Sequence, residues 1–164
     1  MMIKTITQEF EIRAYYDLLI KAITDEPQFF RISPIDIENE VFPTQDTFES
    51  FTLGAFSDEG ELVGTIGFKR DSFLKLRHKG LIFRMYVSDK AKGHGLGRKL
   101  LHALIERATQ GEGLRQLYLT VVSSNQRAIN LYFSEGFETY SREKGSIRIA
   151  KNEFVDEESM IKYL

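Results

Sequence analysis

Residues 87–101 read Val87-Ser88-Asp89-Lys90-Ala91-Lys92-Gly93-His94-Gly95-Leu96-Gly97-Arg98-Lys99-Leu100-Leu101, and this stretch decides the fold. The stretch begins at the end of a run, residues 81–87, that alternates as a β-strand. Four apolar residues of this run are predicted on one face: Leu81, Phe83, Met85 and Val87. Beyond the glycines, apolar residues recur at helical spacing: Leu96, Leu100, Leu101, Leu104, Ile105 and Ala108. The stretch therefore predicts a strand, a glycine-rich turn and the start of a helix.

The glycine-rich turn has the features of a pyrophosphate-binding site. A helix N-terminus presents unpaired N–H groups and the positive end of a dipole. Glycines let a phosphate approach that backbone, and Lys92 and Arg98 add positive charge. The alternative is an ordinary turn in which glycines only relieve strain, and this short pattern alone does not separate the two.

Two known phosphate-binding motifs do not match this turn. A P-loop ends in Gly-Lys-Ser/Thr, whereas Gly97 is followed by Arg98, Lys99 and Leu100. The dinucleotide fingerprint needs Gly-x-Gly-x-x-Gly near the start of a doubly wound sheet. Here the spacing is Gly-x-Gly-x-Gly in the middle of the chain, which disfavours a dinucleotide-binding oxidoreductase.

A second informative segment spans residues 117–137. Residues 117–122 alternate as a half-buried strand, and Ser123-Ser124-Asn125 is suited to capping a helix start. Gly136 stands where a helix C-cap is expected, with apolar Phe137 after it. A strand, a helix over 96–109 and a second strand predict a parallel crossover.

Together the two segments resemble the GNAT N-acetyltransferases. That family has an acyl-coenzyme A-binding motif, Gln/Arg-x-x-Gly-x-Gly/Ala, after a strand that ends in Val. Gly93 and Gly95 match the two glycine positions of the motif. Lys90 stands where Gln or Arg is usual. Lysine keeps the charge but loses the planar fork of arginine, so a cofactor contact from Lys90 is left open. The second family motif is matched by Asn125-x-x-Ala128-Ile129-x-Leu131-Tyr132-x-x-x-Gly136-Phe137.

The resemblance implies an α/β fold with a mixed sheet, in a single domain over residues 1–164. The N-terminal strands are expected to be antiparallel, the central parallel pair to splay apart, and helices to cover both faces. The expected elements are strands over 3–6, 48–56, 61–69, 81–87, 116–122, 137–141, 146–150 and 159–164, with helices over 7–24, 34–41, 96–109 and 125–135. Thr7 is the expected cap of the first helix, and a charged turn is expected between the last two strands.

The resemblance also implies transfer of an acetyl group from acetyl-CoA directly to a primary amine, in a small molecule or a protein. A backbone N–H near Met85 would hold the acetyl carbonyl, and Tyr132 would donate a proton to the departing thiolate. The implied coenzyme A-binding residues are Met85, Tyr86, Val87, Lys92, Gly93, His94, Gly95, Leu96, Gly97, Arg98 and Asn125. A non-catalytic acyl-CoA sensor or interaction module is the alternative, against which the presence of both Asn125 and Tyr132 argues.

Several residues have a simpler structural explanation as well. Tyr132 alone fits a core tyrosine, Asn125 alone a helix cap, and His94 an exposed loop residue. Residues considered as the general base, each weakly supported, are His78, Glu49, Glu61, Arg84 and Tyr86. Side chains that would line either an acceptor pocket or the core are Phe29, Phe30, Ile32 and Phe42.

Composition excludes or disfavours several classes of function. The chain has 22 basic and 24 acidic residues, and this balance gives no support for binding nucleic acid or membranes through bulk charge. It has no Cys, which excludes disulfides, cysteine-ligated metal sites and a cysteine acyl-enzyme. Its three His lack metal-ligand spacing. Without a signal-like or 18-residue apolar run, the expected location is the cytoplasm. A homodimer is a family tendency.

Overall fold

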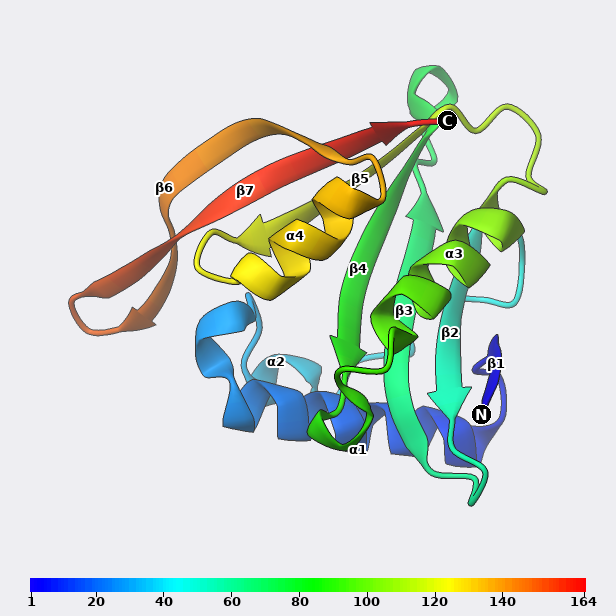
Figure 1. Ribbon diagram of the computed structural model, residues 1–164, viewed down its shortest axis with the longest axis horizontal. Helices are drawn as coiled ribbons and strands as arrows, with labels where there is room; N and C mark the ends of the chain where they lie inside the picture. The colour runs from blue at the N-terminus through cyan, green and yellow to red at the C-terminus, as the bar shows by residue number, and fades with distance from the viewer.

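The computed structural model describes residues 1–164 and is organised around one seven-stranded sheet of order β1-β2-β3-β4-β5-β7-β6 (Figure 1). All neighbouring strands are antiparallel except the central pair β4–β5, which is parallel. The strands are β1 (Met2–Thr5), β2 (Ser50–Phe56), β3 (Leu62–Arg70), β4 (Lys79–Val87), β5 (Gln116–Val122), β6 (Glu138–Ala150) and β7 (Glu153–Tyr163). The helices are α1 (Glu9–Asp25), α2 (Pro34–Ile37), α3 (Leu96–Ala108) and α4 (Gln126–Ser134), with short 3-10 turns η1 (Pro27–Phe29), η2 (Leu74–Leu76) and η3 (Asp89–Ala91).

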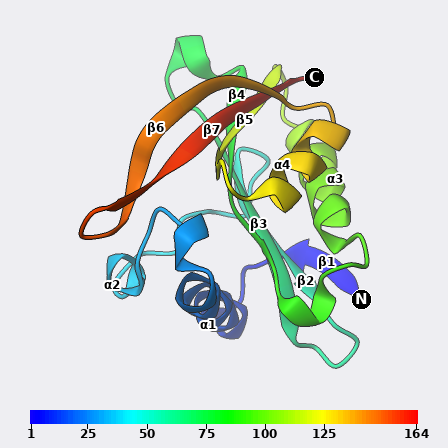
Figure 2. The ribbon, with the colours of Figure 1, turned by 60° about the vertical axis from the view of Figure 1, so that its left-hand side comes forward.

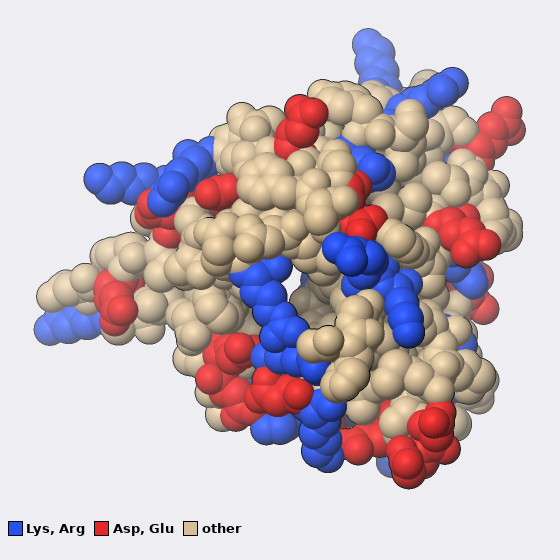
Figure 3. Space-filling view, viewed as in Figure 1, with Lys and Arg blue, Asp and Glu red and all other residues tan.

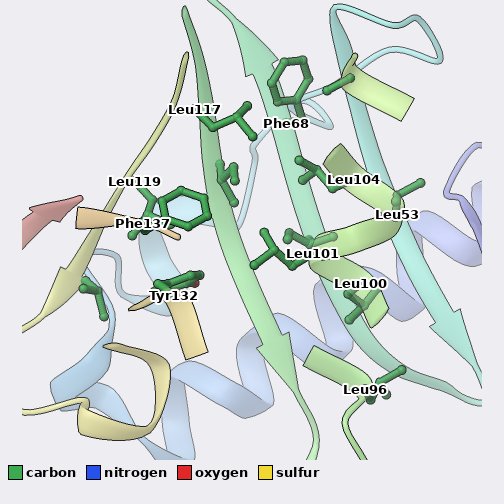
Figure 4. Packing of buried hydrophobic residues seen from close by; sticks show 14 of the residues in the cluster. Leu53, Phe68, Leu96, Leu100, Leu101, Leu104, Leu117, Leu119, Tyr132 and Phe137 are labelled. Atoms are coloured by element: carbon green, nitrogen blue, oxygen red, sulfur yellow. The ribbon is translucent and has the colours of Figure 1, made fainter. Parts of the chain in front are cut away.

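Helices cover both faces of the sheet, as expected. Figure 2 shows α1 and α2 on one face and α3 and α4 on the other. The predicted apolar stripe of α3 lies against the sheet. In the same core, Tyr132 and Phe137 pack beside Leu119 (Figure 4). A second, smaller core lies under α1 and includes Tyr15, which is fully buried. Burial of these two apolar surfaces is the main force that holds the helices on the sheet.

The two motif segments form the predicted strand–helix units. Asn125 caps α4, because its side-chain oxygen accepts a hydrogen bond from the Ala128 N–H at 3.2 Å. Gly136 ends the helix with φ +83°, and the Phe137 N–H donates to the Tyr132 carbonyl at 3.0 Å. This Schellman-type ending confirms the predicted glycine C-cap.

The parallel pairing between β4 and β5 is short. Only Lys79–Leu81 pairs with Gln116–Tyr118, although β4 continues to Val87 and β5 to Val122. Beyond Leu81 the two strands separate, as Figure 1 shows. The expected splay of the central pair is therefore present.

A β-bulge in β4 overturns the predicted common face of Leu81, Phe83, Met85 and Val87. Thr65 pairs with Tyr86 but Gly67 pairs with Phe83, so β4 carries one extra residue, and Arg84 within the bulge has φ +48°. An extra residue inverts the alternation of side chains beyond it. Ile82, Met85 and Val87 consequently contact the core beneath α3, while the Phe83 ring lies over Gly67 on the other face.

Most element boundaries differ from expectation by one or two residues, and three differences change the description of an element. Strand β6 runs unbroken from Glu138 to Ala150 and β7 begins at Glu153, so the predicted separate strands and long charged turn are wrong. The N-cap of α1 is Gln8 and not Thr7, because the Glu11 carboxylate accepts the N–H groups of both residues. Helix α2 ends at Ile37, earlier than the expected end at 41.

An ion pair between a buried carboxylate and an exposed arginine joins β7 to the segment between η1 and α2. Glu157 is 4% exposed, and its two oxygens accept the Arg31 Nε–H at 2.9 and 2.7 Å. Burial raises the pKa of Glu157, but hydrogen bonds from Arg31 and Ser146 outweigh it, and the net pKa lies below its ordinary value.

This lowered pKa gives Glu157 a pH-dependent contribution to stability. The contribution is complete above the unfolded-state pKa, about 4.3, and is lost as the pH falls through the lower folded-state pKa. We expect Glu157→Gln to reduce the free energy of unfolding by roughly 1–2 kcal/mol at pH 7. Urea unfolding of both proteins between pH 7 and pH 3 should show this difference shrinking in acid. A difference that stays constant across that range would contradict the assignment.

Candidate active site

The glycine-rich turn presents a continuous row of free backbone donors. Gly93 and Gly95 have φ +87° and +71°, a region that favours glycine, and α3 begins at Leu96. None of the N–H groups from Gly93 to Arg98 donates a hydrogen bond to an acceptor within the protein. Successive free N–H groups at a helix start form an anion-binding concavity. The turn thus has the geometry expected of a phosphate cradle.

The gap between β4 and β5 adds a second set of backbone groups. The Ser88 N–H donates to Val63 of β3 at 2.9 Å, and Tyr86 pairs with Thr65 of β3. Because backbone groups alternate in direction along a strand, those of Met85 and Val87 point away from β3, toward the gap. Pairing with β5 has already ended there. This edge of β4 is available to an extended ligand.

The cradle and the gap open into one cleft of about 550 Å³. Figure 3 shows the surface hollowed at this place, with Lys and Arg side chains along its border. Residues of the predicted site that line the cleft are Met85, Tyr86, Val87, Lys92, Gly93, Gly95, Leu96, Gly97, Arg98, Asn125 and Tyr132. His94 does not line it; this exposed side chain contacts the Lys92 carbonyl through Nδ1 at 3.1 Å.

Sequence reasoning missed several residues of the cleft. Glu26, just after α1, was missed because no local pattern connects it to the glycine turn, whereas Phe29 of η1, expected to line either an acceptor pocket or the core, lines the cleft. The others lie within or beside the two motif segments: Ala91, Ser124, Gln126, Arg127, Ala128 and Leu131. Ala128 and Leu131 are motif positions and Arg127 lies between two of them, so the second motif was the signal that could have found these three.

Tyr132 is the buried hydroxyl of the cleft. Its ring packs on Phe137 with centroids 5.6 Å apart, and its hydroxyl donates to Met85 Sδ at 3.4 Å. Burial raises the pKa of Tyr132 well above its ordinary value of about 10. The phenol stays protonated at neutral pH, and its only protein partner is a weak sulfur acceptor. This proton is therefore available to a stronger acceptor placed in the cleft.

The basic side chains near the cradle are largely paired within the protein. Lys92 Nζ lies 2.5 Å from Asp89 and 3.4 Å from Glu26, and Arg98 Nε lies 2.5 Å from Glu135. Burial lowers the pKa of Lys92, but the carboxylates of Asp89 and Glu26 outweigh this effect, and the net pKa is raised. The charge of these residues is thus partly compensated, and the free backbone N–H groups provide the main anion-binding potential.

Lys90 lies outside the cleft, where Nζ binds Glu61 at 3.0 Å. Lys92, two residues later, does line the cleft, so the geometry favours the family pattern in the register Lys92-x-x-Gly95-x-Gly97. The space around Gly97 is also tight, since a Cβ there would lie 3.1 Å from Met85 Cε and 3.3 Å from Leu131. The register beginning at Lys92 is therefore preferred to the one beginning at Lys90.

Among the residues considered as a general base, only Tyr86 lines the cleft. Glu49 binds Arg77, Glu61 binds Lys90, and Arg84 binds Glu40. His78 precedes β4, at the end opposite the cradle.

No group of three or more His, Asp or Glu side chains is placed to hold a metal ion. No helix is long and apolar enough to cross a membrane.

Comparison with known proteins identifies the family. The model of the Acetyltransferase (GNAT) family matches residues 14–137, and the chain belongs to this family. A GNAT acetyltransferase from Streptococcus pneumoniae has the same fold, with 24% identity, a TM-score of 0.83 and 99% coverage of both chains. A putative acetyltransferase from Salmonella typhimurium, solved with acetyl-CoA, is 20% identical with a TM-score of 0.79, and the match covers 100% of this chain and 94% of that one.

Curated relatives match over a shorter region. The spermine/spermidine N(1)-acetyltransferase of Bacillus subtilis is 34% identical over 55 residues, which are 34% of this chain and 36% of the relative. The L-methionine sulfoximine/L-methionine sulfone acetyltransferase of Pseudomonas aeruginosa is 44% identical over 54 residues, 33% of this chain and 31% of the relative. The chain thus matches about a third of the length of these relatives.

The tight space around Gly97 leads to a prediction for cofactor affinity. Gly97→Val should place a branched side chain between Met85 and Leu131, inside the cleft. We expect the affinity for coenzyme A to fall at least tenfold, about 1.4 kcal/mol, in calorimetry. Glu106→Val, at an exposed position of the same helix, is the control and should bind normally. Equal affinity in both variants would show that the ligand lies elsewhere.

Proposed function

We propose that the chain is an N-acetyltransferase that transfers the acetyl group of acetyl-CoA directly to a primary amine. The observation that carries this proposal is the row of free N–H groups from Gly93 to Arg98, which opens into the same cleft as Tyr132 and the unpaired edge of β4. Family membership supports the reaction type, and the cleft supports the placement of each role.

Each part of acetyl-CoA has its own proposed place in the cleft. The N–H groups of the cradle, at the start of α3, would hold the pyrophosphate. The edge of β4 at Met85 and Val87 would pair with the pantetheine amides as an added strand, because those backbone groups lack a partner in β5. Gly97 and Leu131, from α3 and α4, line the cleft between these two elements of the proposed site. Asn125, whose oxygen caps α4, lines the cleft and is proposed as a further contact.

The reaction needs charge stabilisation at the carbonyl and a proton at sulfur. The Met85 N–H is proposed to donate to the acyl oxygen as negative charge develops there. The deprotonated amine nitrogen forms the new N–C bond, and the C–S bond breaks with its electron pair leaving on sulfur. Tyr132 is proposed to give its proton to that thiolate, while the amine proton passes to solvent. Tyr132 is then reprotonated by water, so atoms and charge balance.

For the acceptor we propose a small-molecule amine. The curated relatives are named for spermine or spermidine and for methionine sulfoximine or sulfone, all amines of low molecular weight. Glu26 and Phe29 also line the cleft, and the Glu26 carboxylate lies 3.4 Å from Lys92 Nζ. A carboxylate beside an aromatic ring suits a group that arrives as an ammonium ion.

A ligand screen tests the proposed donor. A ligand that binds only the folded state at a hundredfold excess over its Kd stabilises that state by roughly 2.7 kcal/mol. We expect acetyl-CoA to raise the melting temperature by several degrees, and NAD and ATP to leave it unchanged. A shift with NAD and none with acetyl-CoA would reject the assignment.

Substitution of Tyr132 tests the proposed proton donor. Tyr132→Phe removes only the hydroxyl, and we expect kcat to fall about 10²–10⁴-fold while the affinity for coenzyme A stays the same. The matched control is Tyr118→Phe, whose hydroxyl binds Asp71 at 3.2 Å outside the cleft. Turnover and melting temperature are measured on both variants with an acceptor from an amine panel. Turnover within twofold of wild type in Tyr132→Phe would remove this residue from the mechanism, and no turnover in any protein would favour an acyl-CoA sensor.

A further inference from the structure

Arg84 has an uncommon backbone conformation next to the proposed carbonyl donor. It is the one non-glycine residue with positive φ, at +48°, and it precedes Met85 in the β4 bulge. A side-chain-bearing residue persists in this region only when its surroundings hold it there. The question is which contacts hold Arg84.

The guanidinium of Arg84 is fixed by a compact polar cluster on the α1 side of the sheet. Its two terminal nitrogens each donate to one oxygen of Glu40 at 2.7 Å, and one also lies 3.3 Å from the Tyr15 hydroxyl. Tyr16 donates to the same carboxylate at 3.1 Å. The side chains of Arg84 and Glu40 are only 17% and 24% exposed, so this bidentate pair is poorly screened by water.

The bulge decides which way Met85 points. Without the extra residue, alternation would turn Met85 and Val87 to the opposite face of the sheet. With it, the Met85 side chain reaches Tyr132, and its backbone faces the gap. The contacts that retain the bulge therefore also retain the geometry of the carbonyl donor.

We propose that Glu40 and Arg84 are a positioning pair, which holds the β4 bulge so that the Met85 N–H points at the acyl carbonyl. This inference rests on the proposed function, in which that N–H binds the carbonyl oxygen. Neither side chain lines the cleft. The pair acts through the backbone and links the segment after α2 to the reacting centre.

A ligand comparison that needs no acceptor tests the pair. Acetyl-CoA has the carbonyl, whereas S-ethyl-CoA, a thioether of similar shape, lacks it. One neutral hydrogen bond corresponds to roughly a threefold to tenfold preference, so calorimetry on the wild type should show about that ratio of Kd values. We expect Glu40→Gln and Arg84→Ala to reduce the ratio below twofold, with the Kd for S-ethyl-CoA unchanged.

The two variants and one control separate positioning from simple stabilisation. Alanine removes the guanidinium but keeps the Cβ, so positive φ at residue 84 stays strained and nothing holds it once the clamp is gone. Asp46→Asn disrupts another partly exposed ion pair, with Arg107, away from the cleft and should keep the full preference. A lower melting temperature with an unchanged preference in Glu40→Gln and Arg84→Ala would overturn the positioning role alone. A wild type with no preference would overturn the carbonyl donor itself and, with it, this inference.

Discussion

The early end of the β4–β5 pairing is the constraint on which the site depends. Two central strands that separate leave backbone groups unpaired inside a sheet, which is costly unless both strands are held elsewhere. On its far side β5 pairs with β7 along its full length, from Gln116 to Val122. On the other side β4 stays paired with β3 around the bulge. Complete outer pairing thus keeps the inner gap open.

Backbone geometry, more than side-chain charge, defines the chemistry of the cleft. The turn at Gly93 and Gly95 leaves N–H groups without acceptors, while Lys92 and Arg98 are held by carboxylates. A near-neutral protein, with a net charge of −2, can therefore contain a strong local anion site. The gap in the sheet adds further amide groups, so recognition of a long, extended donor needs few dedicated side chains.

Local signals made much of this molecule predictable from sequence. Helical periodicity over 96–108 and the cap residues Asn125 and Gly136 act over a few residues, and they led directly to α3, α4 and most of the cleft. The bulge at Arg84 was not predictable, because no glycine marks it and a distant carboxylate, Glu40, holds it. Glu26 and Phe29 reach the cleft only through tertiary packing.

The outer hairpin of β6 and β7 was predicted incorrectly for a different reason. Almost every residue of β6 is solvent-exposed, so the strand lacks the apolar alternation that sequence reading requires, and its continuity comes from pairing with β7. Strand β7 follows β6 in the chain yet lies between β5 and β6. Edge strand β6 therefore has nothing to pair with in the sheet until β7 has docked on β5. The assembly order of this half of the protein is imposed by topology: the hairpin must form first and dock as a unit, or β7 must dock alone and recruit β6 afterwards.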